Sequence, residues 1–187
     1  MGKLKRFALF ALSVILLMAG SACRLTPIKA RTIKELLGTY SLIEYNITVE
    51  EQVTDLIDSL DFFYLVVNEN ACVMTAYRSV GSDDCVTGEY NTMYQYKSGT
   101  TDMIEEVKAR IPMPHSTLEN GLELNYFTVS PDDTLVCQKF IYEKPESSDQ
   151  PTIRKIIYLK LVKVSNISKY SYIEEVTGIA PIKTRHF

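Results

Sequence analysis

The sequence predicts a mainly β protein: a single antiparallel up-and-down β-barrel of about eight strands, with one or two short helices. Three observations support this fold class. Valine, isoleucine and tyrosine are frequent, with 12 Tyr among 187 residues, and these residue types favour strands. Short runs of them recur between turn signals. The chain also lacks both the alternation of strands with long helices that indicates a parallel sheet and the fixed repeat period of a propeller or solenoid.

Residues 1–22 are predicted to be a signal peptide. A short basic segment precedes an apolar run over residues 7–18, which is shorter than the ~20 residues of a membrane-spanning helix. Small residues follow at 19–22, and the next residue is Cys23. This layout resembles a bacterial lipoprotein signal, in which the cysteine is lipidated and becomes the mature N-terminus. The alternatives are plain secretion and an uncleaved anchor. Residues 23–35 then form the lipidated cysteine and a tether.

The first half of the barrel begins with a strand of partial alternation at residues 37–45. Apolar residues then recur at helical spacing over 48–60, which predicts a brief amphipathic helix. The clearest hairpin joins residues 62–67 to residues 71–78 through a short polar loop. A further strand covers residues 86–96, where tyrosines alternate along one side.

The second half begins with residues 100–110, which are predicted to be either a helix or an irregular strand. A hairpin then joins residues 121–130 to residues 134–143, because Pro-Asp-Asp at 131–133 is a good turn sequence. Residues 153–164 alternate in their second half and form the closing strand.

The expected domain organisation is one barrel at residues 36–164, followed by a C-terminal tail at residues 165–187. The tail is weakly patterned, with a short helix predicted near residues 171–176. A mature length near 165 residues suits one domain with a proper core.

The segment LLGTYSL at residues 36–42 follows a helical turn and opens the first strand. It resembles the start of lipocalin-like (calycin-type) domains, many of whose bacterial members carry it just after a lipoprotein tether. The resemblance covers roughly Ile33 to Val164. It implies that Gly38 turns the chain beneath the barrel floor and that Tyr40 plugs that end. Tyrosine replaces the more usual tryptophan, and the sequence assigns no counterpart to the arginine that packs across that ring in typical lipocalins.

Net charge excludes one class of partner. Without residues 1–22 the chain has 17 basic and 23 acidic residues, a net charge of −6. An acidic balance without a basic cluster argues against nucleic acid. The expected partner is instead a membrane, through the lipid on Cys23, with the protein exported to the outer face of the cell membrane, or secreted or periplasmic if Cys23 is not lipidated.

Three cysteines besides Cys23 are present, so at most one disulfide forms among them. Cys72 and Cys85 flank a predicted turn and could pair across a hairpin if both face the same way in register. The alternative is that these two and Cys137 are buried, apolar and reduced. No Cys/His spacing suggests a metal site.

No sequence motif indicates catalysis or a cofactor. His115 lies in a proline-rich loop and His186 next to the C-terminus, and neither shares a motif with a cysteine or an acid. The acidic pairs, such as Asp83-Asp84, lack the alternating spacing of a calcium loop, and no glycine-rich phosphate cradle is present. We therefore expect a protein that is not an enzyme.

The tyrosines are the best clue to binding. In a small barrel alternate residues point inward, and eight strands enclose either one small ligand or only side chains. We expect a ligand site formed by tyrosines of several strands, namely Tyr90, Tyr94, Tyr96, Tyr64 and Tyr126. The predicted function is binding of a small hydrophobic or amphiphilic molecule without catalysis. The alternative is a filled barrel that serves as a protein-interaction or envelope-assembly module.

Overall fold

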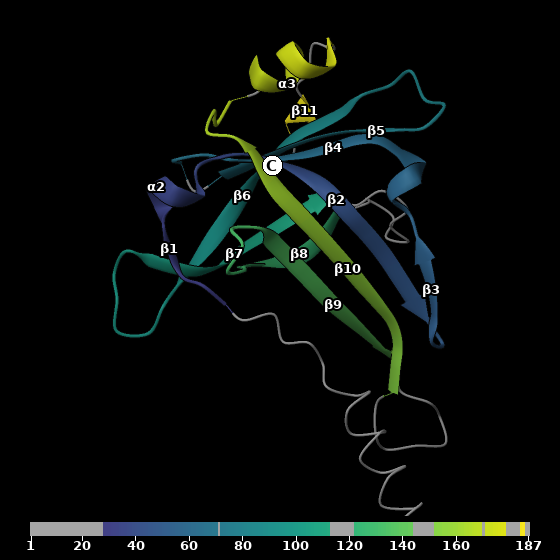
Figure 1. The fold of residues 1–187 in the computed structure, drawn as a ribbon, viewed down its shortest axis with the longest axis horizontal. Helices are drawn as coiled ribbons and strands as arrows, with labels where there is room; N and C mark the ends of the chain where they lie inside the picture. The colour runs from purple at the N-terminus through teal and green to yellow at the C-terminus, as the bar shows by residue number, and fades with distance from the viewer. Residues whose placement is uncertain are drawn as a thin grey trace, which may run out of the picture.

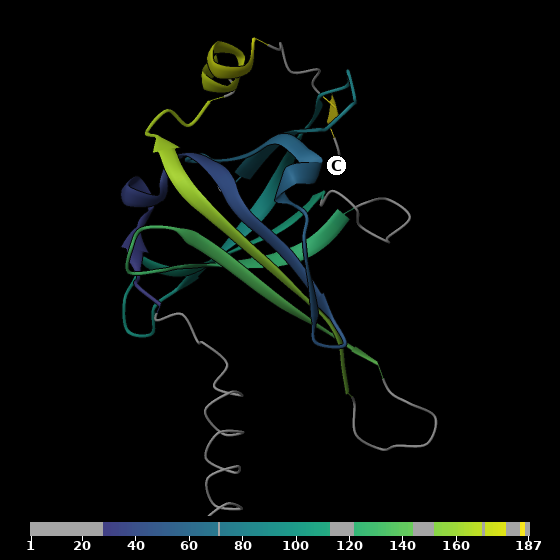
Figure 2. The same ribbon diagram turned by 45° about the vertical axis from the view of Figure 1, so that its right-hand side comes forward.

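The computed structural model describes residues 28–70, 72–112, 122–143, 152–169, 171–178 and 184–185. Eight strands close into an antiparallel barrel (Figures 1 and 2). They are β2 (Gly38–Val49), β4 (Leu60–Val67), β5 (Cys72–Ser79), β6 (Val86–Tyr96), β7 (Met103–Pro112), β8 (Leu122–Val129), β9 (Leu135–Glu143) and β10 (Thr152–Ser165). Each of these strands pairs with the next along the chain, and β10 returns to β2. The predicted up-and-down barrel is confirmed.

Short strands and helical elements accompany the eight strands of the barrel. Strand β1 (Arg31–Thr32) pairs with β7, β3 (Gln52–Asp55) pairs with β2, and β11 (Thr184–Arg185) runs parallel to β6. The helical elements are α2 (Ile33–Leu36), the 3-10 turn η1 (Ile57–Ser59) and α3 (Ser171–Thr177). We call the end of the barrel next to α2, where β2 begins and β10 ends, the α2 end.

The interior of the barrel is occupied by side chains. Within the described part of the chain, inward-facing residues of all eight strands and of α2 form one contiguous apolar cluster. Its largest members, such as Tyr40, Tyr45 and Phe127, are at most 2% exposed. Alternation along each strand places these residues inside, and an eight-stranded barrel is narrow enough for side chains to fill.

The predicted amphipathic helix at residues 48–60 is wrong. This segment contains the end of β2, then β3 and η1. Glu50 and Glu51 have φ values of 48° and 69° and form the turn of the β2–β3 hairpin. Two of the apolar residues that suggested a buried helical face, Val49 and Val53, lie in the hairpin and are 42% and 66% exposed. The others, Leu56, Ile57 and Leu60, lie around η1 and pack on the core. Over a dozen residues, chance apolar spacing imitated a helix.

Of the two alternatives predicted for residues 100–110, the strand is correct, and it is β7. Val107, Ala109 and Ile111 point inward and are at most 1% exposed, whereas Lys108 and Arg110 alternate with them on the outer face. Period-two burial is the signature of a strand with one face in the core.

A second apolar cluster lies outside the barrel. Ile173 of α3 is fully buried against Val66, Met74 and Ala76, which project outward from β4 and β5. The C-terminal helix predicted near residues 171–176 therefore exists and covers an outer apolar patch. Among the residues that the structure describes, no helix has both the length and the apolar character needed to cross a membrane.

Candidate functional site

The α2 end is built around Gly38. Its φ of 141° disfavours other residue types, and an added Cβ would lie 2.3 Å from the Ser165 carbonyl oxygen and 2.6 Å from Lys163 Cε. Only glycine allows this close approach of the first barrel strand to the last. The approach brings α2, which precedes Gly38, against the end of β10.

Tyr40 and Lys163 close this end of the barrel together. They are paired across β2 and β10, and Lys163 Nζ lies 6.0 Å from the centre of the Tyr40 ring. The Tyr40 hydroxyl donates to the Leu36 carbonyl at 2.8 Å, and Lys163 Nζ donates to the Glu35 carbonyl at 2.9 Å. Burial raises the pKa of Tyr40 above its ordinary range, and desolvation lowers the pKa of Lys163 although Glu35 opposes this shift.

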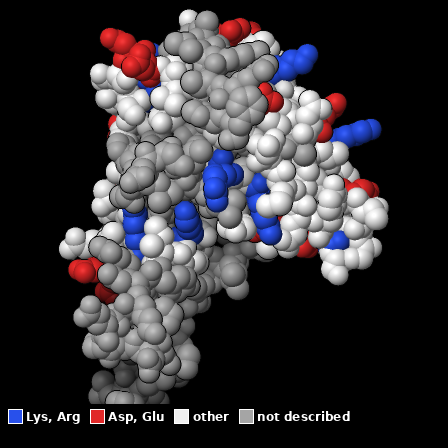
Figure 3. Space-filling view, turned by 180° about the vertical axis from the view of Figure 1, so that it is seen from behind, with Lys and Arg blue, Asp and Glu red and all other residues white. Residues whose placement is uncertain are grey.

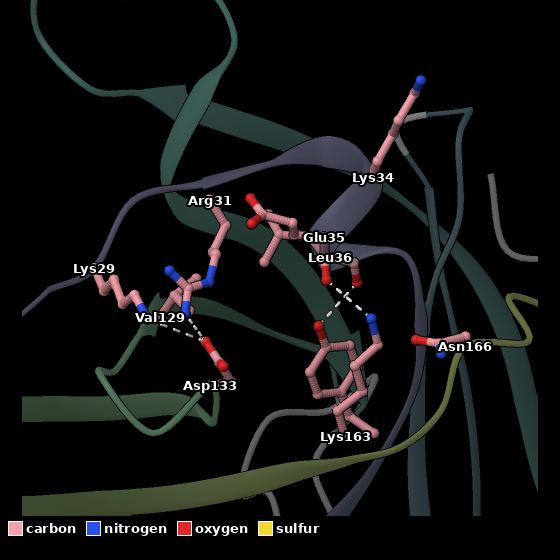
Figure 4. A pocket seen from close by; sticks show the side chains of 10 residues that line it. Lys29, Arg31, Lys34, Glu35, Leu36, Val129, Asp133, Lys163 and Asn166 are labelled. Atoms are coloured by element: carbon pink, nitrogen blue, oxygen red, sulfur yellow. Dashed lines mark hydrogen bonds and ion pairs between the residues drawn. The ribbon is translucent and has the colours of Figure 1, made fainter.

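A pocket of about 420 Å³ opens beside this pair. It lies between the segment leading into α2, the β8–β9 turn and the end of β10 (Figure 4). Four basic and two acidic residues line it, so positive charge is in excess. We call it the α2-end pocket. Its lining residues are Lys29, Arg31, Lys34, Glu35, Leu36, Tyr40, Val129, Asp133, Lys163 and Asn166.

Arg31 is the more enclosed member of the ion pair that it forms with Asp133 in this pocket. Its side chain is only 13% exposed, whereas that of Asp133 is 62% exposed. Lys29 Nζ shares the same Asp133 oxygen at 3.9 Å, and the Lys29 backbone N–H donates to the Val129 carbonyl at 2.7 Å. Strand pairing of Arg31 with Ile104 adds a second tie. The basic segment is thus held against the barrel at both its backbone and its side chains.

Glu35 stays negatively charged beside the pocket, with its carboxylate engaged in a capping box. The Thr32 backbone N–H and hydroxyl both donate to Glu35 Oε2, at 2.8 and 2.9 Å. These bonds from Thr32 lower the pKa of Glu35. Figure 4 shows Lys34 pointing away from the other residues of the pocket. Lys29, Arg31 and Lys163 are therefore the cations positioned around the cavity.

Two of the five tyrosines predicted to line the interior lie there or next to it. Tyr90 lies in the interior, and Tyr94 is partly buried next to the interior cluster. Tyr90 is 6% exposed and belongs to the interior cluster, against which Tyr94 packs. The Tyr94 hydroxyl donates to the Asn68 carbonyl at 3.3 Å. Tyr96 follows a register shift in the β6–β7 pairing and is 48% exposed. The residue skipped in this pairing, Glu105, belongs to β7, so the irregularity does not turn Tyr96 to the other face of the sheet. Tyr96 is exposed at the last position of β6, which alternation along the strand did not predict.

Tyr64 and Tyr126 do not lie in the interior. Tyr64 packs against the outer cluster under α3, with its ring 5.6 Å from that of Phe62. Tyr126 is 42% exposed on the outer face of β8, where Lys108 Nζ lies 5.3 Å from its ring centre. The neighbours of both tyrosines in the strand point inward, so the tyrosines themselves point outward. The sequence of each strand alone did not show which of its two faces would lie inside the barrel.

Cys72 and Cys85 are free thiols, so the disulfide alternative is wrong. Both flank the β5–β6 connection, but Cys72 is paired with Asn91, and Tyr77 with Val86. Cys85 therefore lies about six residues along the ladder from Cys72, roughly 20 Å at the rise of a strand, far beyond the ~7 Å limit between bonded cysteines. Cys137 is buried and reduced, with its Sγ 3.8 Å from Asn125 Oδ1.

Among the described residues, no group of three or more His, Cys, Asp or Glu is placed to hold a metal ion. Burial, followed by the hydrogen bond and charge of Glu89, raises the pKa of the Cys72 thiol to about 12, which keeps it protonated and unreactive. Cys23, His115 and His186 lie outside the described residues.

Sequence reasoning missed the α2-end pocket. Lys29, Arg31 and Lys34 are close in the chain, and this small basic cluster was a usable signal. Nothing local indicated that Lys163 and Asp133 would join them. Seen from behind the view of Figure 1, Lys and Arg gather near the middle of the molecule, with Asp and Glu mostly at its margins (Figure 3).

Comparison of the chain with models of protein families finds no match, and comparison with curated proteins finds none either.

Proposed function

We propose that this chain is a lipocalin-like envelope lipoprotein, anchored through Cys23, whose barrel binds other molecules through its outer surface without catalysis. The observation that carries the proposal is the single apolar cluster to which all eight strands contribute. An interior packed at native density would have no room for a ligand. The packing therefore favours the filled-barrel alternative over ligand storage inside the barrel.

The α2 end supports the lipocalin-like part of the proposal. Lys163 stands over the ring of Tyr40 and donates to a backbone carbonyl of the preceding helical turn. This is the role of the arginine that packs across the first-strand aromatic residue in typical lipocalins. Lys163 is thus the candidate counterpart that the sequence alone did not assign.

The filled interior is tested by titrating the protein with a fluorescent fatty acid and, separately, with benzene. We expect no saturable binding of either by the natural sequence. Phe127→Ala and Leu159→Ala are the positive controls for benzene, because each removes a side chain that is 1% exposed inside the barrel and should leave a cavity that admits it. Saturable one-to-one binding of the fatty acid by the natural sequence would overturn the filled-barrel proposal.

The anchor is tested separately, in cells fed a fatty acid that carries an alkyne tag. We expect the natural chain to take up the label and to sediment with membranes, and Cys23→Ala to do neither. Equal labelling of both forms would show that the lipid, if any, is attached elsewhere.

A further inference from the structure

We propose that the α2-end pocket binds a phosphate group, and that an anionic phospholipid of the anchoring membrane supplies it. The phosphate site itself is independent of the proposed function. Only the lipid as its source rests on the proposed anchor at Cys23.

The donors are those that phosphate recognition requires. Arg31 presents five N–H groups from a side chain that is 13% exposed, and its Nη2 is the atom engaged with Asp133. Lys163 Nζ carries three N–H groups, one of which goes to the Glu35 carbonyl. A guanidinium fork and an ammonium group lining one recess suit the several oxygens of a phosphate.

Apolar residues also contribute to the lining of the pocket. Leu36, Tyr40 and Val129 line it and are each at most 2% exposed. A cavity of about 420 Å³ is larger than one phosphate needs and lies within the ~300–1,000 Å³ of small-molecule sites. Cations together with these apolar residues fit a phosphodiester together with its glycerol carbons.

The charge distribution favours a membrane as the source. Residues 24–37 hold four basic residues and one acidic residue, although the whole chain has a net charge of −3. Lys29 follows Cys23 by six positions, and six residues of extended chain span ~20 Å. A lipid on Cys23 would thus hold the pocket within reach of the headgroups, and basic residues beside an anchor attract anionic lipids.

The test uses residues 23–187 with Cys23→Ser, a form that contains every described element and has no lipid of its own. Its binding is measured on phosphatidylcholine vesicles with and without phosphatidylglycerol. The pocket variant is Arg31→Gln with Lys163→Met. The matched control is Arg110→Gln with Lys155→Met, which removes the same two charges from strand positions outside the pocket. Circular dichroism checks that each variant folds.

We expect the Cys23→Ser form without further substitutions, and the control variant, to bind vesicles that contain phosphatidylglycerol. The pocket variant should bind about thirtyfold more weakly, because each basic residue near an anionic surface contributes roughly a fivefold gain in affinity. Should the pocket variant fail to fold, Lys29→Gln is used instead, since this side chain lines the pocket and is more exposed. That variant is expected to weaken binding in the same direction, by about fivefold.

Two results would overturn the proposal: equal weakening by the pocket variant and the control, or no weakening by either. A third arm titrates inorganic phosphate and glycerol phosphate, followed by phosphorus NMR. Binding of these that depends on Arg31 and Lys163, without vesicle binding, would overturn the lipid source and support the phosphate site. Because Cys23 is absent from this form, failure of the anchor in cells leaves these results unaffected.

Discussion

Lys163 and Tyr40 lie opposite each other across β10 and β2, with the ammonium 6.0 Å from the ring centre. This contact joins the first strand of the barrel to the last at the end where the chain enters. The same lysine reaches the Glu35 carbonyl, 128 residues away in the sequence. Barrel closure, the position of α2 and the α2-end pocket are therefore parts of one arrangement.

Gly38→Ala is expected to destabilise the barrel strongly. The new methyl group would lie 2.3 Å from the Ser165 carbonyl oxygen, a backbone atom that cannot move alone, at a φ of 141°. Gly99→Ala is the matched control, since Gly99 also has positive φ but a methyl group added there would meet nothing within 4 Å.

Urea unfolding measures both variants. The control should lose ~1–2 kcal/mol of unfolding free energy through backbone strain alone, and Gly38→Ala should lose clearly more, because a clash is added. Equal losses would contradict the close packing of β2 against β10.

Gly88→Ala is expected to cost ~1–3 kcal/mol of unfolding free energy through overpacking. The Tyr90 ring lies over Gly88 inside the barrel, and an added Cβ would be 2.2 Å from the Tyr90 hydroxyl oxygen. In a Tyr90→Leu background the same alanine should cost much less, because the obstructing end of the ring is gone. A double-mutant cycle measures this coupling, and strict additivity would show that the two residues do not interfere.

The cysteines should stay reduced and slow to react in the folded protein. Cys72 has a pKa of about 12, which burial and Glu89 both raise, so iodoacetamide should not label it at neutral pH. Glu89→Gln should speed its labelling, because the nearby negative charge is removed. Mass spectrometry of the intact protein measures the labelling, and a Cys72–Cys85 disulfide in that spectrum would contradict the β5–β6 register.

Stability at acid pH should depend on Asp132 in the β8–β9 turn. The Ser130 and Thr134 hydroxyls donate to its carboxylate and lower its pKa, with Lys160 adding to the effect. Since the folded pKa lies below the ordinary value of 3.8, this stabilisation is complete above that pH and is lost as pH falls below it.

As pH falls below that value, Asp132→Asn should therefore lose less unfolding free energy than the natural sequence does. The difference should not exceed ~1 kcal/mol, because the carboxylate is largely exposed and screened. Asp83→Asn, in an exposed loop, is the control. It should leave the dependence of unfolding free energy on pH below 3.8 unchanged. If Asp132→Asn and the natural sequence lost unfolding free energy equally at acid pH, the assigned pKa shift would be contradicted.

The fold was predictable because its signals are local. Alternation between turn residues located β6 at Val86–Tyr96, with the same bounds in sequence and structure, and the Pro-Asp-Asp turn located the β8–β9 connection. Local signals failed where they were short, as in the β2–β3 hairpin, or where a strand ends, as at Tyr96. The α2-end pocket escaped prediction because its contacts are long-range: Arg31 and Asp133 are 102 residues apart.

The filled interior is tested most directly by the stability of Ala109→Leu. Ala109 is 1% exposed on the inner face of β7, between Thr92 and Asn125 on the neighbouring strands. A packed interior cannot accept three more carbons without strain, so we predict a loss of ~1–3 kcal/mol in the free energy of unfolding. Unchanged or increased stability would contradict the filled barrel, because leucine would then have filled a cavity large enough for a ligand.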